Sequence, residues 1–283
     1  MLRSSYLKVD KTLKPLFRLF FRFPKTLAID KINPYTLAQR RTAMTDETRE
    51  SNKGASYARN PLTIRGLSNS NVWDYENAFY QFSHPSRLNK LLAHYDLYKN
   101  ITNLPGDIFE LGVYKAASLV RLATFRNVLE NDYSRKIVGF DAFGKFPVTN
   151  LTLKVDIDFI EDFEKAGGNG LALNEVESIF ELKNFENVML NEGNVFDTLP
   201  KYLEKYPATR IAFLHLDMDV KEPTTFALNL LYDRVVPGGL IVLDDYNSVA
   251  GETDAVDEFL KTHHLKIEKT THYIVPSFIR KPY

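Results

Sequence analysis

Short apolar runs alternate with longer amphipathic stretches along most of this chain. From residue 108 onward, runs such as "KIVGFDAF" and "RIAFLHLD" have the length and nearly continuous apolar character of strands buried on both faces, and helix-like segments separate them. Strands of this kind belong to parallel sheets, because each helical crossover returns over one face of the sheet. The alternation therefore predicts an α/β protein with a doubly wound, mostly parallel sheet.

Seven strands are expected in this sheet. The five apolar runs lie at 108–114, 136–143, 187–193, 210–217 and 240–246, and two short strands follow at 265–270 and 273–281. A helix is expected over 223–236, followed by a Pro-Gly-Gly turn. The connection from Asp141 to Glu175 is too long for a simple turn, so it should contain extra structure that forms part of a substrate wall.

Two regions precede the first of these strands. Residues 1–70 are irregular and polar, and we expect a partly helical appendage there, with the main domain over 71–283. Within that domain, 71–104 carries apolar residues at helical spacing and predicts one or two helices that form a lid. The first 41 residues hold ten Lys and Arg against two Asp, a charge of ten minus two, or +8. Such a segment can touch an anionic membrane surface, although packing on its own domain or on a sister subunit is the commoner arrangement.

Composition argues against several classes of function. The whole chain has 36 basic and 36 acidic residues, so no overall field attracts nucleic acid. It contains no cysteine, which excludes disulfides, thiolate metal sites and cysteine nucleophiles and agrees with a cytoplasmic location. The basic stretch "LKPLFRLFFRFPK" is too short and too charged for a membrane span, and it lacks the apolar core of a signal peptide.

Nearly every predicted strand ends on an acid. In an open α/β sheet, ligands bind beyond the carboxyl ends of the strands, so acids at several strand ends converge on one crevice. The acids at the five main strand ends are Glu110, Asp141, Glu192, Asp217, Asp219, Asp244 and Asp245. Together they predict a binding site at this edge of the sheet.

The first of these strand ends favours S-adenosyl-L-methionine as the cofactor. The turn "ELGVYKAAS" has one glycine, Gly112, so a dinucleotide pyrophosphate lacks the glycines that it needs, and the chain has no P-loop. S-adenosylmethionine carries an ammonium, which Glu110 can receive, and two ribose hydroxyls, which Asp141 can bind. Gly112 allows close approach of the backbone, and the helix start near Ser118 offers N–H groups to the carboxylate of the methyl donor.

The fourth and fifth strand ends predict a metal site. Asp217 and the pair Asp244-Asp245 are one strand–helix–turn unit apart, so they meet at one rim if the two strands are neighbours. Converging carboxylates repel one another unless a divalent cation lies among them, and all-oxygen ligands favour Mg²⁺. The alternative for Asp244-Asp245 alone is a turn or a helix cap.

Two candidate general bases lie near this predicted site. Asp219, two residues after Asp217 and therefore on the same face of an extended strand, is the candidate general base, and Lys221 is a rival. His215 is expected to be a satisfied buried histidine rather than a metal ligand.

Six motifs from Phe82 to Phe259 resemble the macrocin O-methyltransferase family, whose Mg²⁺- and S-adenosylmethionine-dependent members methylate sugar hydroxyls in antibiotics and on nucleotide-activated deoxysugars. The motifs are "ELGVYKAAS", "VGFDAFGKFP", "EGNVFDTLP", "LHLDMDVKEPT", "VPGGLIVLDDY" and "GETDAVDEF". The resemblance implies a Rossmann-like methyltransferase sheet, a lid formed by "FSHPSRLNKL" that includes Arg87 and Leu88, and Gly193 and Asn194 near the adenine. It also implies Glu110, Gly112, Ser118 and Asp141 at the donor, Asp217, Asp244 and Asp245 at Mg²⁺, and Asp217 or Asp219 as the base.

Some positions depart from the family pattern. Met218 replaces the usual glycine between the two aspartates, Lys221 and Pro223 replace an aromatic residue and a serine, and Ala116 and Ala117 replace glycines. The changes after Asp219 fall where the acceptor should bind, so they affect the identity of the substrate more than the chemistry.

The function implied is a homo-oligomeric O-methyltransferase whose acceptor is a sugar or nucleotide sugar, such as a dTDP-6-deoxyhexose or a polysaccharide unit. Two alternatives stay open. One is a metal-dependent O-methyltransferase for a catechol-type diol, which would have an acceptor pocket with more aromatic walls. The other is a donor-binding scaffold without catalysis, which the intact acid cluster disfavours.

Overall fold

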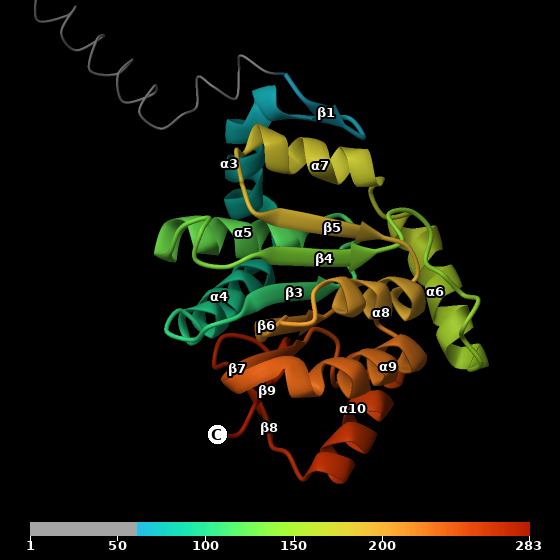
Figure 1. Ribbon diagram of the computed structural model, residues 1–283. Coiled ribbons are helices and arrows are strands. Elements are labelled where there is room, and N and C mark those ends of the chain that lie inside the picture. Colours follow the sequence, from blue (N-terminus) through green and yellow to red (C-terminus); the bar gives the residue numbers. More distant parts are fainter. Residues whose placement is uncertain (1–60) are drawn as a thin grey trace, which may run out of the picture. The chain divides into compact units, whose positions relative to one another are not determined.

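The chain forms one central sheet of seven strands. The computed structural model describes residues 61–283, so the predictions made for the basic segment up to residue 60, its helical content and its membrane contact included, lie outside the described residues. The sheet order is β5-β4-β3-β6-β7-β9-β8 (Figure 1). The strands are β3 (Asp107–Leu111), β4 (Ile137–Asp141), β5 (Val188–Glu192), β6 (Ile211–Leu216), β7 (Val235–Leu243), β8 (Ile267–Lys269) and β9 (Ser277–Arg280). The pairs from β5 to β7 are parallel and those of β9 are antiparallel, which confirms the mostly parallel seven-stranded sheet.

Helices cover both faces of this sheet, as predicted. The helices on one face are α4 (Pro85–Lys99), α5 (Ala117–Leu129) and α7 (Leu173–Leu182), and those on the other are α8 (Val195–Lys205), α9 (Lys221–Leu231) and α10 (Ala250–His263). Alternate strand residues enter the two cores: Ile108 packs in the first, and its neighbour Phe109 packs in the second. This alternation explains why the strands are apolar throughout.

The long connection after β4 contains an additional helix, α6 (Lys154–Gly167), as expected. It lies beyond the carboxyl ends of β4 and β5 (Figure 1). Asp156 of α6 is buried and accepts a hydrogen bond of 2.9 Å from the backbone N–H of Lys221, the first residue of α9. The contact ties α6 to the start of a helix that follows the predicted metal site.

Two helices, α3 (Val72–Phe82) and α4, precede β3, which agrees with the sequence. Before them lie a hairpin, β1 (Thr63–Ile64) with β2 (Leu67–Ser68), and a 3-10 helix, η3 (Asn69–Asn71). In the hairpin, Arg65 donates hydrogen bonds to the carbonyl oxygens of Asn169 and Gly170, at 2.7 and 2.6 Å. The domain boundary at residue 70, the lid function and the homo-oligomer stay predictions.

The predicted helix over 223–236 was wrong at its end. The helix α9 ends at Leu231, a 3-10 turn η4 (Tyr232–Arg234) follows, and β7 already begins at Val235. The Pro-Gly-Gly segment lies inside β7, where the register with β6 shifts, and Gly238 has a φ of +79°. A bulge with a glycine in the left-handed region accommodates this segment in the strand, and the turn signal in the sequence does not distinguish that bulge from a loop.

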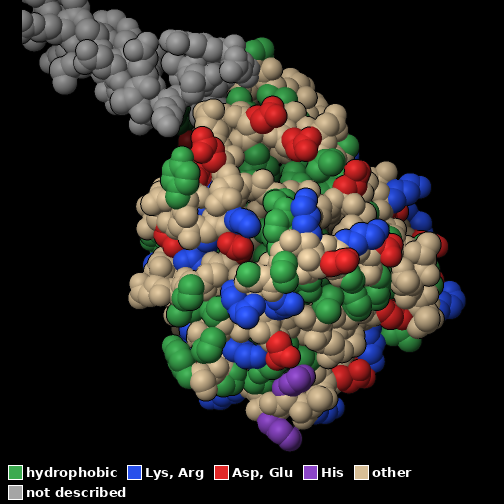
Figure 2. Space-filling view, in the orientation of Figure 1, with side chains coloured by type: hydrophobic (Ala, Val, Ile, Leu, Met, Phe, Trp, Pro, Cys, Tyr) green, Lys and Arg blue, Asp and Glu red, His purple; other side chains and the backbone are tan. Residues whose placement is uncertain are grey.

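The surface mixes charges. Over the face seen in Figure 2, basic and acidic side chains intermingle with apolar ones. Among the residues from 61 to 283, no helix is both long enough and apolar enough to span a membrane.

Candidate active site

A cavity of about 390 Å³ opens at the carboxyl ends of the parallel strands. Loops after β3, β4 and β5 line one side, the ends of β6 and β7 line another, and α6 with the segment before it forms a wall. All of the predicted site residues line it except Glu110. They are Gly112, Ser118, Asp141, Gly193, Asn194, Asp217, Asp219, Asp244 and Asp245.

Gly112 allows the loop that follows β3, residues 112–116 and called the donor loop after its predicted ligand, to cross the end of β6. Its φ is +92°, and a Cβ atom there would lie 1.8 Å from the backbone oxygen of Asp217. The backbone N–H of Asp217 in turn donates to the carbonyl oxygen of Leu111 at 2.9 Å. Any side chain at position 112 would therefore push apart the donor loop and the strand end that carries Asp217.

Asp141 organises the same loop. Its Oδ2 accepts hydrogen bonds from the backbone N–H groups of Val113 and Tyr114 at 2.7 and 2.9 Å, and its Oδ1 accepts one from Phe143 at 2.6 Å. Tyr114 and Ala116 have φ values of +50° and +61°, so the loop contains two non-glycine residues in the left-handed region. Three hydrogen bonds to one carboxylate hold this unfavourable backbone in place. The predicted contact of Asp141 with the ribose stays a prediction.

Glu110 lies behind the cavity wall. It is fully buried; its Oε1 accepts a hydrogen bond of 2.9 Å from the Ser118 hydroxyl, and its Oε2 lies 3.2 Å from Nδ1 of His215. Ser118 lines the cavity, so Glu110 supports the cavity wall through it. That Glu110 receives the donor ammonium directly stays a prediction.

Gly193 and Asn194 form the turn from β5 to α8. The Asn194 side chain caps α8 by accepting a hydrogen bond from the Phe196 backbone N–H at 3.1 Å. The backbone N–H of Gly193 donates to the carbonyl oxygen of Asp141 at 2.9 Å. Both residues are thus held at the cavity by the fold itself, and their place near the adenine stays a prediction.

The predicted metal ligands come together. β6 and β7 are parallel neighbours with Leu216 opposite Leu243, so the residues that follow, Asp217 and Asp244, leave the sheet side by side. Asp217, Asp244 and Asp245 each offer a carboxylate oxygen, and these oxygens all lie within 4.8 Å of one another. The condition set by the sequence, that the fourth and fifth strands are neighbours, is met.

Asp219 reaches the cavity by a different route from the one expected. β6 ends at Leu216, so the shared strand face predicted for Asp217 and Asp219 was wrong. Asp219 instead has a φ of +63°, and its carbonyl oxygen accepts a hydrogen bond of 3.1 Å from Glu252 N–H. A left-handed residue held by the start of α10 brings this side chain to the cavity that Asp217 also lines.

The electrostatics of this cluster favour a cation. Burial raises the pKa of Asp217 well above its usual value, and the carboxylate of Asp244 adds to the rise. Burial and the nearby Asp245 raise the pKa of Asp219 in the same way, and the pKa of Asp245 is also raised by burial and by Asp244. Charging all of these groups together is costly, and a bound divalent cation would offset that cost.

The geometry agrees with the comparisons to known proteins. The sequence matches the family described as macrocin-O-methyltransferase (TylF) over residues 39–279. The chain belongs to this family.

Two relatives and one solved structure are similar to this member of the family. An O-methyltransferase of Streptomyces olivaceus, named for 8-demethyl-8-(2,3-dimethoxy-alpha-L-rhamnosyl)-tetracenomycin-C 4'-O-methylation, is 31% identical over 160 residues, which cover 55% of this chain and 58% of the relative. Demethyldecarbamoylnovobiocin O-methyltransferase of Streptomyces niveus is 30% identical over 172 residues, 56% of this chain and 59% of the relative. Both alignments thus span less than two thirds of the relative's length. The crystal structure of CalS11, a calicheamicin methyltransferase, aligns with a TM-score of 0.55 at 24% identity over 83% of this chain and 92% of its own, which shows the shared fold.

Two departures from the family pattern have visible structural consequences. Ala116, at a family glycine, takes the left-handed conformation before α5 that a glycine would adopt without strain. Met218, between the two aspartates, is 5% exposed and packs in the core on the α8–α10 face. Neither change removes a predicted ligand from the cavity.

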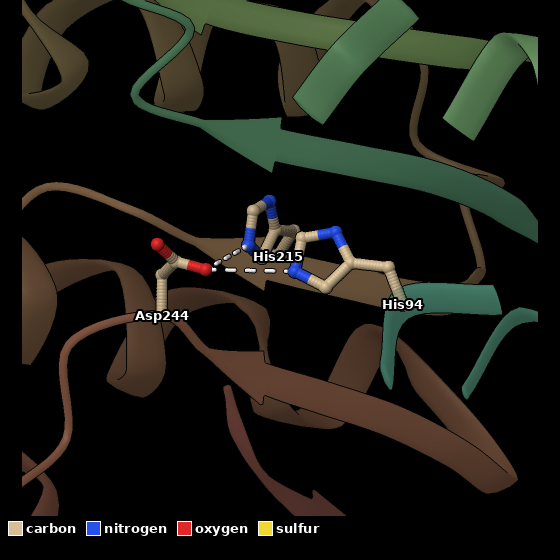
Figure 3. A group of neighbouring side chains, drawn as sticks. All are labelled: His94, His215 and Asp244. Atoms are coloured by element: carbon tan, nitrogen blue, oxygen red, sulfur yellow. Dashed lines mark hydrogen bonds and ion pairs between the residues drawn. The ribbon is translucent and has the colours of Figure 1, made fainter. Parts of the chain in front are cut away.

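Asp244 lies in a network that the sequence did not predict. Figure 3 shows its Oδ1 between Nε2 of His215, at 3.3 Å, and Nε2 of His94, at 3.5 Å. Its other oxygen, Oδ2, is ion-paired with Lys90 of α4. Burial alone would raise the pKa of Asp244, but its contacts with His215 and His94 hold that pKa well below its usual value.

The two histidines differ in charge: His215 is protonated and His94 is neutral. Burial lowers the pKa of His215, but hydrogen bonds to Asp244 and Glu110 outweigh it and raise the pKa to about 10. His215 is therefore a satisfied buried histidine, as predicted. Burial lowers the pKa of His94 to about 4, so this ring is neutral. Its Nδ1 lies 3.0 Å from Arg121 NH1, the donor of that hydrogen bond.

Lys90, His94 and Arg121 are the functional candidates that sequence reasoning missed. Lys90 and His94 are four residues apart and so share one face of α4. The spacing of a lysine and a histidine on one face of a predicted helix was the available signal. It could not be interpreted because nothing in the sequence says which strand end the helix packs against.

The rival base Lys221 points elsewhere. Its Nζ lies 2.7 Å from Glu258 Oε1, and it does not line the cavity. The hydrogen bond to Glu258 raises the pKa of Lys221, whereas a lysine that acts as a general base at neutral pH needs a lowered pKa.

Proposed function

We propose that this chain is an S-adenosylmethionine-dependent O-methyltransferase that methylates a sugar hydroxyl, on a nucleotide-activated deoxyhexose or a polysaccharide unit. The observation that carries the proposal is the convergence of Asp217, Asp244 and Asp245 on the same cavity as the donor loop. Family membership supports it, as does the name of the Streptomyces olivaceus relative, which specifies a rhamnosyl-bearing substrate.

The donor would lie on the β3–β5 side of the cavity. Gly112 and Gly193 line this side with their backbone, and Ser118 lies in the first turn of α5. Asp141, already fixed by three N–H groups, faces the same space. These residues would hold the donor in the same cavity as the acid cluster.

The acid cluster fits Mg²⁺. Asp217, Asp244 and Asp245 supply oxygen ligands within reach of one ion, and the raised pKa values of Asp217 and Asp245 show carboxylates that lack a countercharge. When bound, Mg²⁺ supplies Lewis acidity and a template for two neighbouring hydroxyls of the acceptor.

Asp219 is the proposed base. Its raised pKa, caused by burial and by Asp245, moves its proton affinity toward that of a useful base at neutral pH. Asp219 would take the proton of the acceptor hydroxyl as the oxygen forms its bond to the methyl carbon, while the electrons of the carbon–sulfur bond remain on sulfur. The apolar residues of α6 and its preceding loop, Phe146, Leu151 and Phe163, would exclude water from this step.

Cations in the cavity wall favour an anionic acceptor. Arg87, Lys115 and Lys145 line the cavity in addition to Lys90 and Arg121. Within residues 61–283, Arg87 and Lys145 form no ion pair with an acidic side chain. Two uncompensated cations would suit the diphosphate of a nucleotide sugar.

Aromatic walls support the second candidate, a catechol-type diol. Tyr114, Phe140, Phe146, Phe163 and Phe196 all line the cavity. Part of this surface would contact the adenine of the donor, so the walls do not decide between the two acceptors by themselves.

An acceptor screen with the purified protein separates the two. Methyl transfer from labelled S-adenosylmethionine to dTDP-rhamnose and related nucleotide sugars, with no transfer to a catechol, is the expected result. Transfer to the catechol alone would replace the proposed acceptor. Absence of donor binding in calorimetry would reject the proposed function.

A further inference from the structure

We propose that His94 and His215 are positioning residues that fix the Asp244 carboxylate for the cation, His215 by a hydrogen bond from its Nε2 and His94 by close packing of its Nε2 against the same oxygen. The inference rests on the proposed function, because it takes Asp244 as a cation ligand. It assigns a role to two buried side chains that contact neither the donor nor the acceptor side of the cavity: within the described residues, neither lines it.

The first step is the division of labour between the two oxygens of Asp244. Oδ1 faces both imidazoles, at 3.3 Å from His215 and 3.5 Å from His94. Oδ2 faces Lys90, which lines the cavity. The histidines therefore lie on one side of the carboxylate, at Oδ1, and the other oxygen points away from both rings (Figure 3). That oxygen faces Lys90 and so the cavity that Lys90 lines.

The second step is that each imidazole is itself held from behind. Nδ1 of His215 lies 3.2 Å from Glu110, which also accepts the Ser118 hydroxyl. Nδ1 of His94 accepts a hydrogen bond from Arg121. The two rings contact each other edge to face, with centroids 5.2 Å apart and planes at 77°. Neither ring is free to rotate, so Asp244 is oriented by one rigid donor on β6, His215, and by a rigid ring on α4, His94, that packs against the same oxygen.

The third step excludes these three side chains as a metal site of their own. His94 Nε2, His215 Nε2 and an Asp244 oxygen lie within 4.8 Å of one another, as metal ligands would. However, Arg121 can only donate, so Nδ1 of His94 must accept its hydrogen bond and the ring proton must be on Nε2. His215 faces a carboxylate from each nitrogen, so it donates from both. The N–H of His215 directed at Asp244 is a hydrogen-bond donor, and the N–H on Nε2 of His94 lies 3.5 Å from the same oxygen without forming a hydrogen bond, so neither nitrogen acts as a ligand.

Paired substitutions of His215 test the role. In His215→Gln the side-chain amide keeps a donor near the position of Nε2, toward Asp244. In His215→Asn the amide keeps a partner near the position of Nδ1, toward Glu110. Both variants remove the charge of the imidazolium. His215→Gln weakens the contact with Glu110, and His215→Asn weakens the contact with Asp244. The difference between the two variants therefore reports the contact with Asp244.

The readout is the dissociation constant of Mn²⁺, measured by electron paramagnetic resonance on donor-free protein, with thermal unfolding and donor affinity measured in parallel. We expect His215→Asn to bind Mn²⁺ about tenfold or more weakly than the wild type and His215→Gln within about threefold, because loss of an outer-shell partner commonly costs 10–100-fold in metal affinity. Where neither His215 variant folds, His94→Asn and His94→Gln provide the same comparison, since His94 also meets Asp244 through Nε2.

Each outcome decides the matter. Equal Mn²⁺ affinities for the Asn and Gln variants, with equal losses of thermal stability, would reduce the histidines to a structural role and overturn the inference. A wild-type protein that binds donor but no Mn²⁺ would remove the cation from the proposed function, and the inference with it. Tight Zn²⁺ binding that both His94 variants abolish, while Asp217→Asn retains it, would mean that the histidines are ligands.

Discussion

The two halves of the cavity use their acids in opposite ways. On the donor side, Glu110 and Asp141 have protein partners at both oxygens: Ser118 and His215 for one, three backbone N–H groups for the other. On the β6–β7 side, Asp217, Asp219 and Asp245 face one another, and burial and mutual repulsion raise all three pKa values. An acid at a strand end can therefore either stabilise a loop through hydrogen bonds or remain available to bind a cation.

Asp244 stands between these two uses. It belongs to the β6–β7 side by position, yet His215 and Lys90 bind its two oxygens, as Ser118 and His215 bind those of Glu110. His215 connects the two sides directly, since its ring reaches Glu110 with one nitrogen and Asp244 with the other. The difference between the halves lies in the hydrogen-bond partners of each acid and not in its position along the chain.

The largest effect is expected from Asp217→Asn. This change removes one of three proposed cation ligands but no donor contact, so turnover should fall by at least about 100-fold, the upper range for losing even an outer-shell partner of a metal. Calorimetry should show donor affinity within about twofold of the wild type. A parallel loss of donor affinity would mean that the two halves are not separable.

The second-largest effect is expected from Asp141→Ala, a change on the β3–β5 side of the cavity. Three backbone N–H groups lose their acceptor and two left-handed residues lose their anchor, so the free energy of unfolding should fall by about 3 kcal/mol. Donor affinity should fall with it, whereas Mn²⁺ affinity should change little. Chemical denaturation and an Mn²⁺ titration on the same preparation would measure both, and weakened Mn²⁺ binding would contradict the division.

About half of this comparison could be foreseen from the sequence. The apolar strand runs and the acids that end them identified the sheet, its edge and nine of the cavity residues. This was possible because buried parallel strands have continuous apolar sequences and because ligands bind beyond their carboxyl ends. The partners of those acids could not be foreseen. Lys90 and His94 reach Asp244 across 154 and 150 positions of sequence (244 minus 90 and 244 minus 94), and that contact depends on how α4 packs. The left-handed conformation of Asp219 was missed because the strand pattern was extended past Leu216, where β6 ends.

A smaller effect is expected in the pH dependence of stability. The carboxyl of Asp217 has a raised pKa in the folded protein, so above the ordinary value of 3.8 the folded state holds a proton that the unfolded chain releases. The unfolding free energy of chelated protein should therefore decrease as pH rises, by at most about 1.4 kcal/mol per pH unit for each such proton. The favourable contribution of His215 is complete below pH 6.5 and that of Asp244 is complete above pH 3.8, so neither varies between these values. His94, with a pKa lowered to about 4, opposes the decrease in this range, whereas Asp219 and Asp245, with raised pKa values, add to it.

Urea unfolding at about pH 4.5 and pH 6.5, with chelator and then with Mg²⁺, would measure this dependence. Mg²⁺ should restore stability at the higher pH, and Asp217→Asn should flatten the profile of the chelated protein. A chelated protein that becomes steadily more stable over this range would contradict the raised pKa values.

The smallest effect is expected from Lys221→Met. The lysine is bound to Glu258 on the protein surface and is absent from the cavity wall, so the rate of methyl transfer should stay within about twofold of the wild type, and stability within about 1 kcal/mol. Asp219→Asn, the matched change at the proposed base, should lower the rate by about 10²–10⁴-fold. Reversal of the two results would make Lys221 the base.

The central claim is that the acids at the ends of β6 and β7 serve a cation that methyl transfer requires. The most direct test is the initial rate of transfer from S-adenosylmethionine to a dTDP-6-deoxyhexose, measured in metal-free buffer with chelator and again after Mg²⁺ is added in excess. The claim predicts no turnover with chelator and full recovery with Mg²⁺. The same rate under both conditions would contradict it.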